Sequence, residues 1–153
     1  MKEIKIKYHA DIDKLKQTEN GDFIDLRVGE SIFIKEGTSG LVNLGISMKL
    51  PEGYEAHVLP RSSTFKNFGI ILTNGMGIID NSYSGDDDIW MMNYYCLEGK
   101  DIDEKTKEKG TYISKNTRIG QFRIMKSQDE INFIEVDKLE GENRGGFGST
   151  GNF

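Results

Sequence analysis

The tetrapeptide Pro60-Arg61-Ser62-Ser63 places one guanidinium beside two hydroxyls. Proline restricts the direction of the chain at this point, and the residues from Ser63 to Phe68 could form one short helical turn. Backbone N–H groups at a helix start, hydroxyls and arginine are good donors to phosphate oxygens. The stretch therefore indicates a phosphate-binding site. A simple N-cap role for Ser62 is the alternative that these residues leave open.

A second candidate is the stretch from Asn74 to Asp86, which reads NGMGIIDNSYSGD. Gly75 and Gly77 stand between apolar runs, where a hairpin would turn, and glycine leaves backbone N–H and C=O groups open to a flat ligand. Asp80 ends the apolar run just before the next turn, so it could lie at the edge of a pocket. An Asx turn that caps the strand is the simpler interpretation of an isolated aspartate. Tyr83 could present its ring to a sugar or a base.

The chain ends in RGGFGSTGNF, which contains the pattern G-x-G-x-x-G from Gly146 to Gly151. That pattern binds a dinucleotide only where it follows a strand and opens a helix. The sequence after Gly151 is too short for a helix, so this function is excluded. Arg144 and Phe147 still place a charge and a ring on a glycine-rich strip, which suits a segment that closes over a ligand. A frayed chain end is the alternative.

Short runs of alternating or β-branched residues must position these candidates. Period-two runs broken by turn residues predict an all-β sandwich or barrel. Two stretches, Asp11 to Gln17 and Ser63 to Phe68, could form a turn or two of helix, which is too short to cover a sheet. The expected strands lie within residues 4–8, 31–34, 41–50, 54–59, 70–73, 90–95, 118–125 and 131–136.

Length and composition restrict the function classes. A chain of 153 residues is most simply one domain with a real core. Its net charge of −5 provides no global basic field for nucleic acid or anionic lipid. No apolar run approaches the ~18 residues of a membrane span, and the start, MKEIKIKYHA, lacks the apolar core of a secretory signal. A single cysteine, Cys96, indicates a reducing cytoplasm, and two histidines make a zinc site improbable.

The segment from Glu98 to Gly110, EGKDIDEKTKEKG, mixes charges of both signs densely. Such a segment is typical of a solvated hairpin loop. A role in binding a protein partner is the alternative that we keep open for it.

Taken in order, these stretches resemble the five motifs of the homotrimeric dUTP diphosphatases (dUTPases). The likeness covers essentially the whole chain and is closest to the dUTPases of Gram-positive bacteria and their phages. The corresponding segments are Phe23-Ile24-Asp25-Leu26, Pro60-Arg61-Ser62-Ser63, Gly77-Ile78-Ile79-Asp80-Asn81-Ser82-Tyr83 with Gly85, Arg118-Ile119-Gly120-Gln121, and the eight residues from Arg144 to Gly151.

The resemblance implies hydrolysis of dUTP to dUMP and pyrophosphate, which keeps uracil out of DNA and supplies dUMP for dTTP synthesis. Asp80 would be the general base that activates a water for attack on the α-phosphorus. Tyr83 would stack on the deoxyribose and leave no room for a 2′-hydroxyl. Mg²⁺ would be held mainly by the triphosphate, with Asp25 and Gln121 contacting it through water. The implied substrate-binding residues are Arg61, Ser62, Ser63, Asn74, Gly77, Ile78, Ile79, Tyr83, Gln121, Arg144, Phe147, Gly148 and Ser149.

The resemblance also implies a jelly-roll-like β-barrel that forms a homotrimer with shared active sites. Residues 1–139 would form the barrel, and residues 140–153 a flexible C-terminal arm that closes over a neighbouring site, all within a single domain, 1–153. Each site would combine the second and fourth motifs of one subunit with the third motif of a neighbour.

Two alternatives remain at this stage. A dCTP deaminase resembles dUTPase in fold and shares an Arg-Ser-Ser stretch, but it uses a glutamate, and Gly85 is followed here by Asp86, Asp87 and Asp88. A nucleotide-gated regulator that binds proteins through the 98–110 loop belongs to a different functional class and could coexist with catalysis.

Overall fold

Twelve β-strands and one short helix make up the part of the chain, residues 1–148, that the computed structural model describes. The predicted all-β class is therefore confirmed. The elements are β1 Lys5–Tyr8, β2 Ile24–Arg27, β3 Ile32–Lys35, β4 Ser39–Asn43, β5 Ile46–Lys49, β6 Tyr54–Pro60, α1 Thr64–Phe68, β7 Ile70–Ile71, β8 Gly77–Ile79, β9 Met91–Cys96, β10 Asp101–Ile102, β11 Lys109–Ile113 and β12 Arg118–Lys126.

Most strands form close to the runs that indicated them, and the turn expected at Ser63 to Phe68 is α1. The strand expected at residues 131–136 is wrong, because that segment lies exposed outside the sheets and pairs with no strand of the described chain. The helix expected at Asp11 to Gln17 is also wrong. Its backbone donors bond to distant groups instead, with Asp13 N–H to Asn116 Oδ1 at 2.8 Å and Leu15 N–H to the Tyr8 hydroxyl at 2.7 Å.

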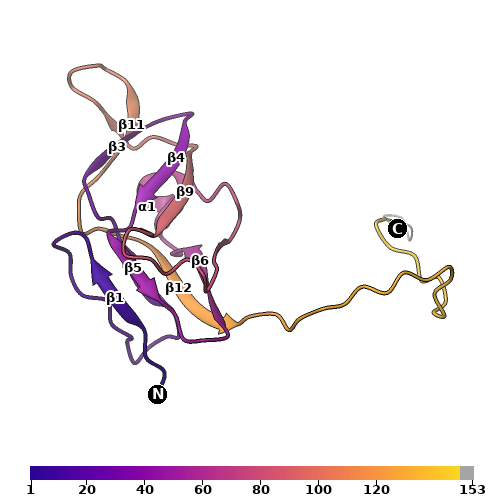
Figure 1. Ribbon diagram of the computed structural model, residues 1–153. Coiled ribbons are helices and arrows are strands. Elements are labelled where there is room, and N and C mark those ends of the chain that lie inside the picture. The colour runs from indigo at the N-terminus through magenta and orange to yellow at the C-terminus, as the bar shows by residue number, and fades with distance from the viewer. Residues whose placement is uncertain (149–153) are drawn as a thin grey trace.

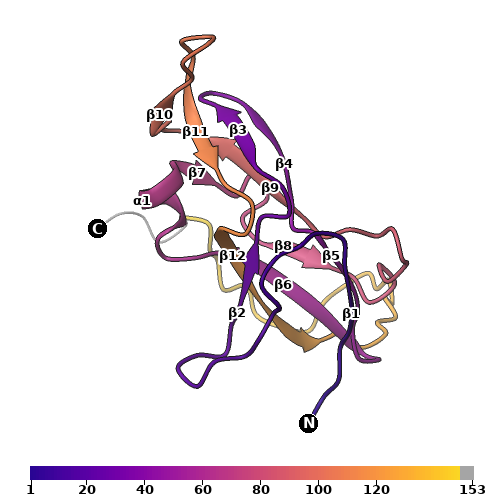
Figure 2. The same ribbon diagram turned by 90° about the vertical axis from the view of Figure 1, so that its left-hand side faces the viewer.

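The strands form four small sheets, whose orders are β2-β12-β6-β8, β4-β9-β7, β10-β11-β3 and β1-β5. The long strand β12 pairs antiparallel with both β2 and β6 and so holds the largest sheet together. In Figure 2 the β10–β11–β3 sheet lies at one end of the molecule, and β2 and the N-terminus lie toward the other. Within residues 1–148 the ladders do not join into one closed ring, so the jelly-roll-like body consists of separate short sheets around a common core.

The hairpin expected around Gly75 and Gly77 is wrong. The apolar runs on either side of it, β7 and β8, lie in different sheets, because β7 pairs with β9 and β8 pairs with β6. The residues between them form a tight turn with Gly75 at a φ of 69°. The segment therefore crosses from one sheet to another instead of folding back on itself.

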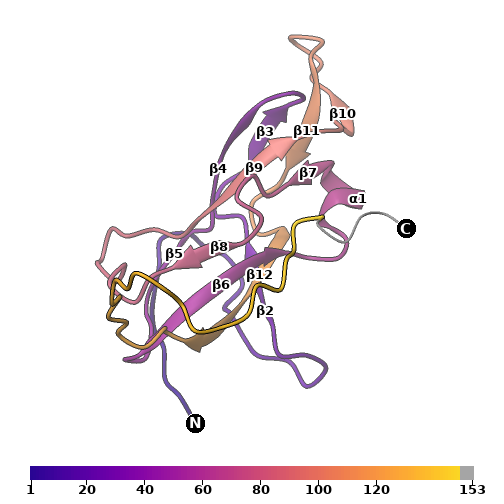
Figure 3. The same cartoon turned by 90° about the vertical axis from the view of Figure 1, so that its right-hand side faces the viewer.

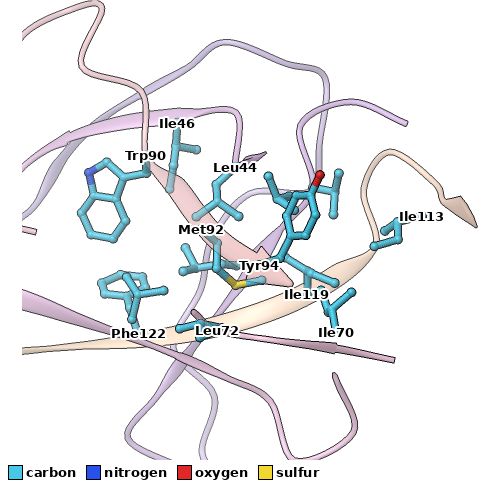
Figure 4. Close-up of a cluster of buried hydrophobic side chains, with 14 of the residues drawn as sticks. Leu44, Ile46, Ile70, Leu72, Trp90, Met92, Tyr94, Ile113, Ile119 and Phe122 are labelled. Atoms are coloured by element: carbon cyan, nitrogen blue, oxygen red, sulfur yellow. The ribbon is translucent and has the colours of Figure 1, made fainter. Parts of the chain in front are cut away.

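The core lies between the β2-β12-β6-β8 and β4-β9-β7 sheets and also takes buried side chains from β3, β5 and β11 (Figure 4). Trp90 and Phe122 pack edge to face, with ring centroids 5.2 Å apart, and neither ring is exposed to solvent. Alternate residues of β9 (Met92, Tyr94 and Cys96) are buried in this cluster, which agrees with the period-two pattern of the sequence, whereas the buried Ile119 and Phe122 of β12 are three residues apart across a register irregularity. The burial of these side chains fixes the strands that carry the candidate site residues.

After β12 the chain leaves this body. Residues 128–148 are all exposed and include no strand or helix. Figure 1 shows this segment running away from the sheets as an extended tail. No helix among the described residues is long and apolar enough to span a membrane.

Candidate active site

Three of the predicted site residues meet at one edge of the largest sheet. Asp25 on β2 is the direct cross-strand partner of Gln121 on β12, so both side chains stand on the same face. Arg61 follows Pro60 at the end of β6, and its Nε–H donates to Asp25 Oδ1 at 3.1 Å. The Gln121 amide donates to the Pro60 carbonyl at 3.1 Å and so fixes the start of the turn that carries Arg61.

A second arginine also contacts Asp25. Arg118 Nη1 lies 3.4 Å from Asp25 Oδ2, so one carboxylate is shared by two guanidiniums. Both pairs are partly open to solvent, and such pairs orient side chains more than they stabilise the fold. The result is a cationic cluster at the edge of the sheet that is suited to bind an anion.

The hydroxyls of Ser62 and Ser63 stand beside this cluster. The N-cap role considered for Ser62 is wrong, because Ser63 is the N-cap residue of α1, and the Ser63 side chain makes no capping hydrogen bond. Neither serine hydroxyl has a hydrogen-bond partner within residues 1–148. Both are therefore available to a ligand.

Asp80 lies directly after β8, in an exposed turn. Its carboxylate accepts hydrogen bonds from the Ser82 hydroxyl and from the Ser82 backbone N–H, the latter at 3.0 Å. These two bonds, with a weaker one from the Asn81 N–H, hold the pKa of Asp80 below the ordinary range of an aspartate. Asp80 thus forms an Asx turn, which confirms the simpler interpretation. At neutral pH its carboxylate is also ionised and held in one direction, so it can accept a proton.

Asn81 and Tyr83 fix this turn to the rest of the fold. The Asn81 amide donates to the carbonyls of Pro51 at 2.7 Å and Tyr54 at 2.8 Å. The Tyr83 hydroxyl donates to the Ile89 carbonyl at 2.9 Å, while its ring stays exposed. Hydrogen bonds to backbone carbonyls therefore hold the turn that carries the Asp80 carboxylate and the Tyr83 ring.

The residues expected to bind a base lie beside this turn. β8 contains Gly77, Ile78 and Ile79 and is an edge strand, since within the described chain only β6 pairs with it. Its outer backbone groups are open to a flat ligand, and the exposed Asn74 precedes them. A Cβ at Gly77 would lie 3.3 Å from Val58 Cβ, which explains the glycine by close packing onto β6.

The Arg61 cluster and the Asp80 turn lie apart along β6. Ile79, the residue before Asp80, pairs with Ala56 near the start of β6, whereas Arg61 follows the end of that strand. From Ala56 to Arg61 the distance along the strand is about 16 Å, at roughly 3.3 Å per residue. In Figure 3, α1 lies near one end of β6 and β8 runs beside it toward the other. Asp80 and Arg61 of the same chain therefore lie toward opposite ends of β6.

The predicted tail residues also lie away from the Arg61 cluster and from the Asp80 turn. Arg144, Phe147 and Gly148 lie in the exposed segment beyond β12, and the Phe147 ring makes no packing contact that shields it. Gly145 and Gly148 have φ values of 80° and 84°, which suit a chain that turns sharply. Ser149 lies outside the described residues.

No group of three or more His, Cys, Asp or Glu side chains in the described part of the chain could hold a metal ion. Asp25, predicted to contact Mg²⁺ through water, is already paired with two arginines. A metal that depends only on protein ligands does not fit this arrangement. A metal that arrives with a polyphosphate does fit it, because Asp25 and Gln121 face the same side of the sheet as the arginines.

The model of the dUTPase family matches residues 10–151. The chain belongs to the dUTPase family. The predicted resemblance is confirmed, and the match favours this family over the deaminase alternative.

The relatives span nearly the whole chain. The SPbeta prophage-derived deoxyuridine 5′-triphosphate nucleotidohydrolase YosS of Bacillus subtilis is 51% identical over 150 residues, which cover 97% of this chain and 98% of the relative. The deoxyuridine 5′-triphosphate nucleotidohydrolase of Fusobacterium nucleatum is 34% identical and is matched over 88% of this chain and 86% of its own length.

Solved structures of the family share the fold. A Staphylococcus bacteriophage 80alpha dUTPase with dUpNHpp superposes with a TM-score of 0.77 at 18% identity and covers 97% of this chain and 98% of its own. A dUTPase from phage phi11 of S. aureus, in which a structural Mg(II) ion is coordinated, gives a TM-score of 0.73 at 13% identity, over 91% of this chain and 99% of its own.

Three residues of the motif segments had no role assigned to them from the sequence. Arg118 pairs with Asp25, Asn81 anchors the turn, and Ser82 bonds the Asp80 carboxylate. The Asp-x-Ser spacing of Asp80 and Ser82 is itself a local signal, since a hydroxyl two residues after an aspartate can close an Asx turn. The partners of Asn81 are 27 and 30 residues away, so no local pattern pointed to them.

The loop from Glu98 to Gly110 contains β10 and the start of β11, which pair antiparallel, as expected of a hairpin. Its tip is held by the Asp103 carboxylate, which accepts hydrogen bonds from the Thr106 and Tyr112 hydroxyls. The bond to Asp103 raises the pKa of Tyr112 to about 12, so the phenol stays neutral. The Tyr112 ring is half exposed. A protein partner for this hairpin stays a prediction.

Proposed function

We propose that the protein is an enzyme that hydrolyses dUTP to dUMP and pyrophosphate, and so keeps uracil out of DNA and supplies dUMP for dTTP synthesis. The observation that carries this proposal is the 51% identity, over 97% of the chain, to a deoxyuridine 5′-triphosphate nucleotidohydrolase. The ionised Asp80 carboxylate and the Arg61 cluster supply the base and the anion site that such a reaction needs. A cytoplasmic location stays a prediction.

In the proposed reaction, Asp80 accepts a proton from a water molecule. The water oxygen forms a bond to the α-phosphorus, and the bond from that phosphorus to the oxygen bridging to the β-phosphate breaks. Pyrophosphate leaves with the bridging oxygen. The two hydrogen bonds from Ser82 support this role, because they keep the carboxylate ionised and fix its direction.

The edge strand β8 and Tyr83 are proposed to select the nucleoside. Backbone groups of Gly77 to Ile79, with Asn74, would pair with the uracil edge and leave a buried polar group unpaired if cytosine entered. A thymine methyl would be refused by shape. The exposed Tyr83 ring, held through its hydroxyl at Ile89, would lie on the deoxyribose and exclude a 2′-hydroxyl.

The phosphates would be bound by Arg61, Ser62 and Ser63. Gln121 would contribute from β12, with its amide beside Pro60. Mg²⁺ would be held mainly by triphosphate oxygens, with Asp25 and Gln121 in contact through water, and would offset the charge of those oxygens.

We also propose that the enzyme is a homotrimer with shared sites. The estimated separation of about 16 Å along β6 supports this, because Arg61 of one chain and Asp80 of another must then meet. The tail gives independent support. Its apolar side chains have no packing in a single chain, with Phe133 89% and Leu139 80% exposed, so they suit burial against a neighbour. Arg144, Phe147, Gly148 and Ser149 of that neighbour's arm would then close over the substrate.

The test is pyrophosphate release from dUTP, dCTP, dTTP and UTP, each with and without Mg²⁺. We expect release from dUTP to exceed release from the other nucleotides by orders of magnitude and to depend on Mg²⁺. Equal rates on dUTP and dCTP would contradict the proposal, and ammonia release from dCTP would favour the deaminase alternative.

Replacing Ser82 by alanine is expected to raise the pKa of Asp80, because the largest of the interactions that lower it is lost. A base acts in its ionised form, so its activity is present above its pKa and is lost as the pH falls through it. The acid limb of kcat/KM against pH should therefore move to higher pH in Ser82→Ala. Ser84→Ala removes a hydroxyl from the same loop that does not bond Asp80, and it should leave the limb in place. A limb that moves equally in both variants would contradict the assignment.

Replacing Tyr83 by alanine should raise activity on UTP relative to dUTP, since space opens for the 2′-hydroxyl. The quantity to compare is the ratio of the two kcat/KM values. Tyr83→Phe removes only the hydroxyl that bonds the Ile89 carbonyl and keeps the ring, so its ratio should stay close to that of the wild type. If Tyr83→Ala leaves the ratio unchanged, the sugar is selected elsewhere.

A further inference from the structure

A buried threonine connects the phosphate turn to the strand behind it. Thr64 is the first residue of α1 and is 1% exposed. Its hydroxyl accepts the Arg61 backbone N–H at 2.8 Å and donates to the Ile119 carbonyl at 2.9 Å. Ile119 lies in β12, next to Arg118 and two residues before Gln121. One hydroxyl therefore bonds the backbone of both segments that carry the phosphate site.

Thr64 also holds Arg61 from the other side. The Thr64 backbone N–H donates to the Arg61 carbonyl at 3.0 Å, so both backbone polar groups of Arg61 bond to the same residue. The N-cap Ser63 gives no side-chain support to the turn. The turn is thus held by a residue that lies behind it in the core, and the hydroxyls in front of it stay open to solvent.

We propose that Thr64 is a positioning residue for the phosphate groups of the substrate. It sets the backbone of Arg61, and with it the direction of the guanidinium and of the Ser62 and Ser63 hydroxyls, without touching the ligand itself. This inference rests on the proposed dUTP hydrolysis and deepens it, because it assigns the geometry of the phosphate subsite to one buried hydroxyl.

The test removes that hydroxyl while keeping the shape, in Thr64→Val, and restores it in Thr64→Ser. Binding of the non-hydrolysable α,β-imido-dUTP and of dUMP is measured by calorimetry for each protein. We expect Thr64→Val to weaken binding of the triphosphate analogue by about tenfold or more relative to dUMP. Thr64→Ser should recover the wild-type ratio of the two affinities.

Thr111 provides a matched control at the other end of α1. It is also 1% exposed, and its hydroxyl donates to the Phe68 carbonyl at 2.8 Å and accepts the Lys100 N–H at 3.1 Å. Thr111→Val therefore makes the same chemical change at a β11 residue that bonds the C-terminal end of α1, away from the phosphate turn. Its melting temperature should fall as that of Thr64→Val does, but its affinity ratio should stay at the wild-type value.

Two binding results would overturn the inference: an affinity ratio for Thr64→Val within about twofold of wild type, or an equal change of the ratio in Thr111→Val. Failure of both Thr64→Val and Thr64→Ala to fold would also overturn it, because Thr64 would then serve the fold alone. A wild-type protein that neither binds the analogue nor releases pyrophosphate from dUTP would instead contradict the proposed function, and the inference would fall with it.

Discussion

Turnover of dUTP is expected to fall by roughly 10²–10⁴-fold when Asp80 is replaced by asparagine. The amide keeps the size of the side chain but does not accept a proton from water. Its oxygen can still accept the hydrogen bonds from Ser82, so the turn and the binding of dUTP should survive. The measurements are single-turnover rates and the affinity for α,β-imido-dUTP, each compared with wild type.

Asp87→Asn is a suitable control for this variant. Asp87 is an exposed aspartate of the same connection between β8 and β9, and the same loss of charge there should leave turnover unchanged. If purified Asp80→Asn turned over dUTP within about a factor of ten of wild type, Asp80 would not be the base.

A chain that stops after Glu140 is expected to fold and assemble normally and to hydrolyse dUTP very slowly. The truncation keeps every strand, since β12 ends at Lys126, and it keeps the exposed apolar side chains from Ile131 to Leu139. It removes the guanidinium of Arg144, the ring of Phe147 and the backbone donors around them. Each lost hydrogen bond to a charged phosphate costs about 1.5–3 kcal/mol, so several together reduce the rate by orders of magnitude.

Circular dichroism and the mass of the assembly in solution check the first half of this prediction, and pyrophosphate release checks the second. A double substitution in the full chain, Arg144→Ala with Phe147→Ala, should reproduce much of the loss while the backbone is kept. A truncated chain that retains wild-type kcat/KM would show that the arm takes no part in catalysis.

Short sequence patterns predicted the two turns of the candidate site, the one after Pro60 and the one at Asp80. Pro60 and the hydroxyls after it indicated a short helix and an anion site, and α1 with the Arg61 cluster lies there. The position of Asp80 just before a turn indicated an Asx turn, which the Ser82 N–H closes, because such a turn depends on neighbours within two or three residues. The Asx turn needs little from the rest of the chain, whereas the Arg61 cluster also depends on Asp25, 36 residues away.

Features that depend on distant partners were not predictable in this way. The runs on either side of Gly75 were compatible with a hairpin, but β7 pairs with β9 and β8 pairs with β6, and such pairing is decided by packing across the core. The role of Thr64 depends on the Ile119 carbonyl, 55 residues away. Residues 131–136 alternate as a strand does, but a strand needs a partner, and the described chain offers none.

Mixing two inactive variants tests the central claim, a dUTP-hydrolysing site shared between subunits. One variant is the chain that stops after Glu140, which has Asp80 and lacks the arm. The other is full-length Asp80→Asn, which has the arm and lacks the base. After subunit exchange, verified by native mass spectrometry, some sites will combine a working Asp80 with a working arm, and dUTP hydrolysis should return well above that of either variant alone. If exchange is complete and no activity returns, each arm serves its own chain and the shared site is contradicted.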